Sequence, residues 1–154
     1  MPYRIHETCT GCTACAKLCP VYAISGAKNE RHTINEKRCV ECGVCGRICQ
    51  KSAVADGTGK ICSPVRRSEW SQPVIDTALC SACGICVNDC LPKALRISLP
   101  QFRGDIKVFA ELFESRRCVG CGICRQHCPL KAIQMAAPHM APVHPPMHKT
   151  EAAL

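Results

Sequence analysis

The chain has 154 residues, of which 17 are cysteine and only six are aromatic, and its formal charge is +8. With so few aromatic side chains, two small hydrophobic cores would be marginally stable unless bound metal filled the interior and cross-linked the chain. No apolar run has the length of a signal peptide or a membrane span, so we expect a cytoplasmic protein. Thiols stay reduced in that compartment, which favours metal ligation over disulfides.

An eleven-residue cysteine block with the spacing C-x2-C-x2-C-x3-C occurs four times along the chain. The blocks are residues 9–19, 39–49, 80–90 and 118–128. The repeat extends beyond the cysteines, because an alanine always follows the fourth cysteine by four residues and an aliphatic residue comes next. These alanines are Ala23, Ala53, Ala94 and Ala132. Four identical spacings indicate four copies of one structural unit.

Short apolar stretches flank each block and predict brief strands. They contain Ile5, Ile34, Ile75 and Phe113 before the blocks, and Ile24, Val54, Leu95 and Ile133 after them. A helix of one to two turns should end each block and carry its fourth cysteine. The predicted fold class is therefore α+β, with short strands, short helices and large cysteine loops.

The cysteine spacing indicates [4Fe–4S] clusters. Three cysteines at i, i+3 and i+6 can hold three corners of a cubane while backbone N–H groups point inward at its sulfides. Such a loop needs close backbone approach and unusual dihedral angles, which suits Gly11, Gly43, Gly84, Gly120 and Gly122. Structural zinc is the alternative, but a zinc site needs only four ligands and gives no reason for four cysteines in every block.

The segment from Cys19 to Cys39, with Pro20, Ala23 and Ile34 between them, resembles the two-cluster bacterial ferredoxins. Blocks three and four repeat it with a longer connection, so the resemblance covers about residues 3–136. It implies two tandem ferredoxin-like domains and four [4Fe–4S] clusters, with the fourth cysteine of each block ligating the other cluster of its pair. The implied ligand sets are Cys9, Cys12, Cys15 with Cys49; Cys39, Cys42, Cys45 with Cys19; Cys80, Cys83, Cys86 with Cys128; and Cys118, Cys121, Cys124 with Cys90.

The block positions predict four segments. Residues 1–60 form the first ferredoxin unit, 61–73 a linker, 74–136 the second unit, and 137–154 an extended arm rich in proline and histidine that lies on another subunit. Metal binding by the arm's His139, His144 and His148 is an alternative role. A nested pairing, of block one with four and two with three, is the alternative domain arrangement and occurs in iron–sulfur subunits of some molybdenum enzymes.

Two residues lie outside the repeat pattern. Cys62 belongs to no block, and a buried free thiol is the simplest interpretation. Trp70 lies in the linker, where it is either a core residue or an anchor at an interface. The arginine pairs 66–67 and 116–117 are either solvated or positioned to tune the clusters and to present a docking face.

The sequence contains no nucleophile–base pair, phosphate loop or nucleotide-binding fingerprint, so the chain is not expected to be an enzyme on its own. Sixteen thiolates and four oxidised clusters would bring its charge from +8 to about zero. The basic residues then act as counterions. Because no aromatic-rich basic motif accompanies them, no nucleic-acid partner is expected.

The size and four-block layout are similar to the electron-transfer subunits of bacterial tungsten enzymes, such as aldehyde oxidoreductase and the benzoyl-CoA reductase system. This resemblance implies a relay of low-potential electrons in anaerobic metabolism. Its partners would be a tungsten or molybdenum catalytic subunit and a flavin- or NAD-using subunit, and stacking of chains into a longer cluster wire is an extension of the idea. A freely diffusing polyferredoxin and a subunit of a hydrogenase or formate dehydrogenase complex are the alternatives.

Overall fold

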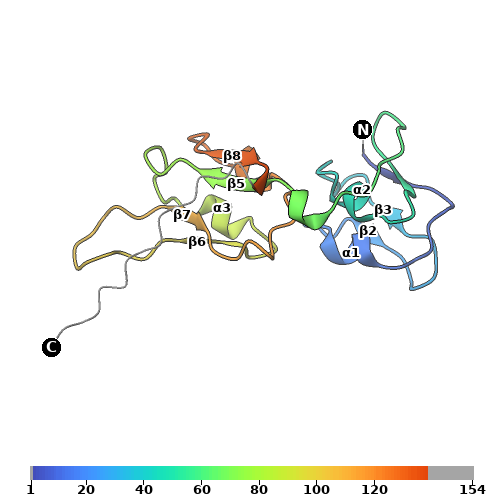
Figure 1. Cartoon of the computed structure of the whole chain (residues 1–154), viewed down its shortest axis with the longest axis horizontal. Coiled ribbons are helices and arrows are strands. Elements are labelled where there is room, and N and C mark those ends of the chain that lie inside the picture. The colour runs from blue at the N-terminus through green and yellow to red at the C-terminus, as the bar shows by residue number, and fades with distance from the viewer. Residues whose placement is uncertain (1, 139–154) are drawn as a thin grey trace.

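The computed structural model describes residues 2–138 and shows two similar halves that lie side by side along the long axis (Figure 1). The first half runs from β1 (Arg4–Ile5) to β4 (Val54–Ala55), and the second from β5 (Gln72–Ile75) to β8 (Ile133–Ala136). Between them lies a linker with one 3-10 turn, η1 (Arg67–Glu69). Most of the predicted arm, including its three histidines, lies outside the described residues.

Each half contains two antiparallel pairs of strands. The first strand of each half pairs with the last, so β1 pairs with β4 and β5 with β8. The inner pairs are β2 (Ile24–Ser25) with β3 (Thr33–Ile34), and β6 (Leu95–Ile97) with β7 (Ala110–Leu112). The predicted apolar stretches therefore do form strands, and the α+β fold class is confirmed.

Four one-turn helices follow the cysteine loops. They are α1 (Ala14–Leu18), α2 (Val44–Ile48), α3 (Ile85–Asn88) and α4 (Ile123–Gln126). Each carries the third cysteine of its block and ends before the fourth, so the expectation that the fourth cysteine is helical is wrong. Cys19 and Cys49 follow their helices in extended conformation, with ψ of 114° and 100°. In the first half the backbone is therefore extended at the fourth cysteine. In the second half, Asp89 and His127, which follow the helices, keep helical dihedral angles.

Phe113 was expected in a strand, but β7 ends one residue earlier. Leu112 pairs with Leu95, and the N–H groups of Phe113 and Glu114 both donate to the carbonyl oxygen of Ala94, at 3.0 and 3.1 Å. This is the two-against-one arrangement of a bulge, and the Phe113 side chain is exposed. The sequence did not indicate the bulge, because Phe113 continues the apolar stretch of the strand.

Three hydrophobic cores follow one another along the molecule. The first half has one around Ile24, Cys45 and Val54, and the second half has one around Ile75, Leu95 and Ile133. The third core lies at the junction and contains Val44, Trp70 and Val119, which come from the first half, the linker and the second half. Trp70 is 2% exposed, so it is a core residue that joins the halves. None of the helices within residues 2–138 has the length and apolar character of a bilayer-crossing segment.

Candidate metal centres

Each cysteine block, together with the three residues after it, holds three residues in the left-handed backbone region. They lie two residues after the first cysteine, one after the second and three after the fourth: Gly11, Thr13 and Tyr22; Glu41, Gly43 and Ser52; Ala82, Gly84 and Lys93; Gly120, Gly122 and Lys131. All five glycines that the sequence indicated for unusual dihedral angles are among them. Residues of alternating hand turn successive N–H groups toward one concave side, which suits an anionic ligand.

The alanine that follows each block binds the sulfur of the fourth cysteine. The N–H groups of Ala23, Ala53, Ala94 and Ala132 each donate to the Sγ of the cysteine four residues earlier, at 3.3 Å in all four repeats. Each alanine is at most 3% exposed, so a larger side chain has no room there. The sequence showed this alanine as a repeat, but its role as an N–H donor was not predicted.

First cysteines of the blocks also accept backbone hydrogen bonds. Gly11 N donates to Cys9 Sγ at 3.5 Å, and Gly120 N donates to Cys118 Sγ at 3.4 Å. In block three the donor to Cys80 Sγ is Ala110 N, at 3.4 Å, from strand β7. Hydrogen bonds to cluster-ligating sulfurs stabilise the more negative reduced state and raise the reduction potential.

The cysteines gather in four groups. One cavity is lined by Cys39, Cys42 and Cys45 with Cys19, a second by Cys80, Cys83 and Cys86 with Cys128, and a third by Cys118, Cys121 and Cys124 with Cys90. In the fourth group, Cys15 lies close to Cys9, Cys12 and Cys49. Every group thus joins three cysteines of one block to the fourth cysteine of the other block in the same half.

The groups surround a space and do not converge on one point. A zinc ion needs its sulfur ligands about 2.3 Å away on all sides. Among residues 2–138 no three His, Cys, Asp or Glu side chains stand close enough to hold a single metal ion. A cubane is held at its outer corners, so thiols around a cavity are the donor set that fits it.

Burial keeps three of the cysteine thiols protonated in the absence of metal. It raises the pKa of Cys45 and of Cys124 to about 12, and that of Cys15 to about 11. Nearby cysteine sulfurs raise these pKa values further. Sixteen thiolates would not ionise together in such a small protein without the positive charge of bound iron.

The hydrophobic cores connect the groups in one row. The core of the first half contains Cys15 and Cys45, which belong to its two groups, and the core of the second half contains Cys86 and Cys124. At the junction, Cys42 and Cys121 pack against the same core. Burial raises the pKa of the Cys42 thiol, and the nearby Cys121 and Cys19 sulfurs add to this effect.

The order along the row therefore differs from the order in the sequence. The groups of blocks two and four meet at the junction, which makes them the inner groups, and those of blocks one and three are the outer groups. The second cysteine of each outer block, Cys12 and Cys83, is exposed. The inner counterparts, Cys42 and Cys121, are half-buried at the junction. The row thus has an accessible sulfur at each end.

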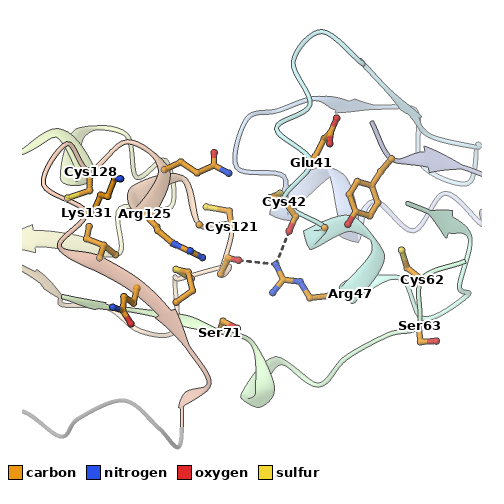
Figure 2. A pocket seen from close by; sticks show the side chains of 18 residues that line it. Glu41, Cys42, Arg47, Cys62, Ser63, Ser71, Cys121, Arg125, Cys128 and Lys131 are labelled. Atoms are coloured by element: carbon orange, nitrogen blue, oxygen red, sulfur yellow. Dashed lines mark hydrogen bonds between the residues drawn. The ribbon is translucent and has the colours of Figure 1, made fainter. Parts of the chain in front are cut away.

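A cleft of about 1210 Å³ opens between the halves beside the inner groups (Figure 2). Cys42 and Cys121 line it, together with the basic side chains Arg47, Arg125 and Lys131. These positive charges lie next to the inner thiols, where they would offset the charge of bound clusters.

Cys62 lies in none of the four groups. It is half-buried, and burial raises the pKa of its thiol. A Cβ atom added to Gly46 would lie 2.7 Å from the Cys62 Sγ, so this thiol packs directly against helix α2. The contact explains the glycine after the third cysteine of block two. Cys62 is a free thiol as expected, but it is half-buried and not fully buried.

Comparison with known families gives two matches. Residues 8–53 and residues 79–133 each match a family described as a 4Fe-4S dicluster domain. The chain carries two 4Fe-4S dicluster domains in tandem. Each domain of this kind carries two [4Fe–4S] clusters. The tandem arrangement is therefore confirmed, and the nested pairing of blocks is wrong.

Relatives of known identity match single portions of the chain. Ferredoxin-2 and Ferredoxin-3 of Chlorobaculum tepidum are each 48% identical over 42 residues, which are 27% of this chain and 66% of each relative. One component of the ion-translocating oxidoreductase complex of Magnetococcus marinus is 56% identical over 32 residues. That match covers 21% of this chain and 18% of the relative, so the chain spans under a fifth of that component's length.

A solved complex from Methanospirillum hungatei contains a chain with a similar course. The complex joins formate dehydrogenase, heterodisulfide reductase and formylmethanofuran dehydrogenase. The match covers 82% of this chain and 47% of the other, with 20% identity and a TM-score of 0.42. A likeness at this level supports no conclusion about function.

Proposed function

We propose that the chain is a four-cluster electron-transfer subunit of an oxidoreductase complex. The observation that carries this proposal is the row of cysteine groups, in which each neighbouring pair shares a hydrophobic core. Each bound [4Fe–4S] cluster can take up and release one electron. The protein's part is to hold four of them in sequence and to tune them by hydrogen bonds and charge.

The proposed ligands are those that the ferredoxin resemblance implied. They are Cys9, Cys12, Cys15 and Cys49; Cys39, Cys42, Cys45 and Cys19; Cys80, Cys83, Cys86 and Cys128; and Cys118, Cys121, Cys124 and Cys90. The cavities and the close sulfurs around Cys15 support these sets. The four N–H···S hydrogen bonds from the repeated alanines support a thiolate at every fourth cysteine.

The proposed domain bounds are 1–60 and 74–136, with a linker at 61–73 and the arm at 137–154.

Electrons would enter at one outer site and leave at the other, because Cys12 and Cys83 are the exposed second cysteines at the two ends. The inner sites would serve passage between the domains. A row with two accessible ends suits a subunit that connects two different partners.

The second domain supports an association with another subunit. Its loop 98–109 exposes Leu99, Phe102 and Ile106, and β7, which follows the loop, donates an N–H to the outer-site Cys80. Exposed apolar side chains on one loop are typical of a contact with another protein.

As partners we propose a tungsten or molybdenum catalytic subunit of the aldehyde oxidoreductase type and a flavin- or NAD-using subunit, in the cytoplasm. Stacking of chains end to end would extend the row.

A freely diffusing ferredoxin is the second candidate, favoured by the matches to two ferredoxins of Chlorobaculum tepidum. The loaded chain would carry a charge of about zero, whereas such carriers are usually strongly acidic.

Anaerobic purification from the native source tests both candidates. We expect about sixteen irons and sixteen sulfides per chain, and co-elution with a catalytic and a flavin-containing subunit. An iron-loaded chain that elutes alone would support the free ferredoxin. Zinc in place of iron would overturn both.

A further inference from the structure

Arg47 reaches across the junction between the two domains. Its Nη2 atom donates to the carbonyl oxygen of Cys42 in its own domain, at 3.2 Å. The same NH2 group also donates to the carbonyl oxygen of Gly120 in the other domain, at 3.0 Å (Figure 2). The carbonyl oxygen of Val119, at 3.5 Å, is a weaker third acceptor that shares one of its two hydrogens. One guanidinium group therefore holds the backbone of both loops that carry the inner cysteines.

Contacts hold both the guanidinium group and the backbone of Arg47. Its guanidinium carbon lies 5.0 Å from the ring centroid of Trp70, a cation–π contact with a side chain that is 2% exposed. Trp70 Nε1 donates to Val65 O at 3.1 Å, and Val65 N donates to Arg47 O at 2.9 Å. The linker thus closes a ring of contacts around this one arginine.

Gly120 shows how closely the domains approach. A Cβ atom at this position would lie 2.5 Å from Ser71 O in the linker and 3.2 Å from Arg47 Nη1. The corresponding residue in block three is Ala82, with φ of 54° against 62° at Gly120. The loop backbone therefore accepts alanine, and Gly120 is glycine because Arg47 and the linker leave no room.

We infer that Arg47 is a positioning residue that holds the two inner cluster sites against each other, and that its charge raises the reduction potential of the inner clusters. This rests on the proposed ligand sets. The planar fork of arginine can bind carbonyl oxygens of two loops at once, whereas a lysine ammonium is a flexible point charge without that geometry. A cation beside a cluster stabilises the extra electron of the reduced state.

The first test compares Arg47→Gln and Arg47→Lys in the full, iron-loaded chain. Arg125→Gln is the control, because it removes an exposed positive charge from the same cleft, beside the inner cysteine Cys124. Potentials are measured by redox titration followed by electron paramagnetic resonance, and domain arrangement by X-ray scattering in solution. Arg47→Gln should lower two of the four potentials and increase the radius of gyration. Arg47→Lys should increase the radius with smaller potential shifts, and the control should leave the radius unchanged.

A second variant tests the junction without changing any charge. Gly120→Ala should push the domains apart and also increase the radius of gyration. Its matched control is Gly84→Ala in the outer block three, where φ is also positive but the nearest atom to an added Cβ is Asn88 Nδ2, at 3.9 Å. This pair remains informative if an Arg47 variant fails to fold.

Iron content separates failure of this inference from failure of the proposed function. A wild-type chain that holds no iron would overturn the proposed function. A loaded Gly120→Ala or Arg47→Gln chain with wild-type scattering would overturn the positioning role of Arg47. Wild-type potentials in Arg47→Gln would overturn the effect of its charge on the inner clusters.

Discussion

The two domains share one repeat but use the same positions differently. The residue before each fourth cysteine is Leu18 or Ile48 in the first domain, and both pack against the junction core. In the second domain the residues are Asp89 and His127, whose side chains lie 2.7 Å apart at the surface. The repeat therefore fixes the metal sites, while the residues between the cysteines decide what each short helix contacts.

The hairpin loops differ even more. In the first domain, loop 26–32 covers the outer cysteine loop: Asn29 N donates to Gly11 O at 3.0 Å, and a Cβ on Gly11 would lie 2.3 Å from Glu30 N. In the second domain, loop 98–109 extends away from the rest of the molecule (Figure 1). The position that corresponds to Gly11 is Ala82 there. Loop length thus determines whether the hairpin loop packs on the backbone of the outer cysteine loop, while Cys12 and Cys83 are exposed in both domains.

The largest effect should come from replacing the proposed cysteine ligands, one domain at a time. If fourth cysteines are exchanged within each domain, Cys49→Ser should alter the same paramagnetic signal as Cys9→Ser. Cys128→Ser should likewise match Cys80→Ser in the other domain. Each variant loses one cluster or converts it to a three-iron form, which iron analysis and electron paramagnetic resonance would detect.

Cys62→Ser is the matched control, because Cys62 lies in none of the groups and the variant should keep all four signals. If Cys49→Ser instead reproduces Cys39→Ser, each block binds its own cluster and the assignment is wrong.

The next effect concerns the extended loop. Replacing Leu99, Phe102 and Ile106 by serine keeps the loop length but removes its exposed apolar side chains. We expect four intact clusters and at least about tenfold weaker association with the partner subunit, which corresponds to about 1.4 kcal/mol. Calorimetry or co-purification with the partner checks this.

A charge control on the same loop is the double change Arg103→Gln and Lys107→Gln. If it weakens association and the serine variant does not, the contact depends on charge and the apolar interpretation is wrong.

Much of the structure could be predicted from the cysteine spacing and the apolar stretches around it. The strands formed where aliphatic residues flanked the blocks, because each strand pairs within its own half and places an apolar residue in that half's core. The loop glycines have positive φ as expected. Glu41, Ala82 and Thr13 adopt it as well, because the loop's course imposes the conformation whether or not the residue is glycine.

The junction could not be predicted in the same way. Arg47 and Gly120 are 73 positions apart in the sequence, and neither belongs to a pattern that links them. Trp70 is a single aromatic residue in a linker, so its burial depends on how two domains pack. The N–H groups of the four repeated alanines were not predicted as donors to the fourth cysteines for another reason. Any residue has a backbone N–H group, so only the small size of the repeated alanine indicated a special position.

A smaller effect should distinguish the covered from the uncovered outer loop. Gly11→Ala should destabilise the first domain by about 1–3 kcal/mol, because the new Cβ would collide with the backbone of Glu30. Ala82→Gly, at the corresponding position of the second domain, should change the stability by about 1 kcal/mol or less, because the entropy cost of glycine is offset by relief of the positive φ of 54°. Thermal unfolding of the loaded protein under anaerobic conditions measures both. Equal effects at the two positions would show that loop 26–32 does not constrain the site.

The smallest effect is expected for the ion pair that the second domain has in place of apolar contacts. Asp89 and His127 are 38% and 52% exposed, so water and salt screen the pair, and His127→Gln should cost about 0–1 kcal/mol. At the corresponding position of the first domain, Ile48→Ala should cost about 1–2 kcal/mol, since Ile48 is partly buried against Trp70 and Val44. Because the two residues occupy the same repeat position, the difference measures how much the junction core adds to the stability of the first domain. The unfolding of both variants is compared at the same iron content and salt concentration. A larger loss for His127→Gln than for Ile48→Ala would mean that the surface pair, and not the apolar junction, holds the short helices in place.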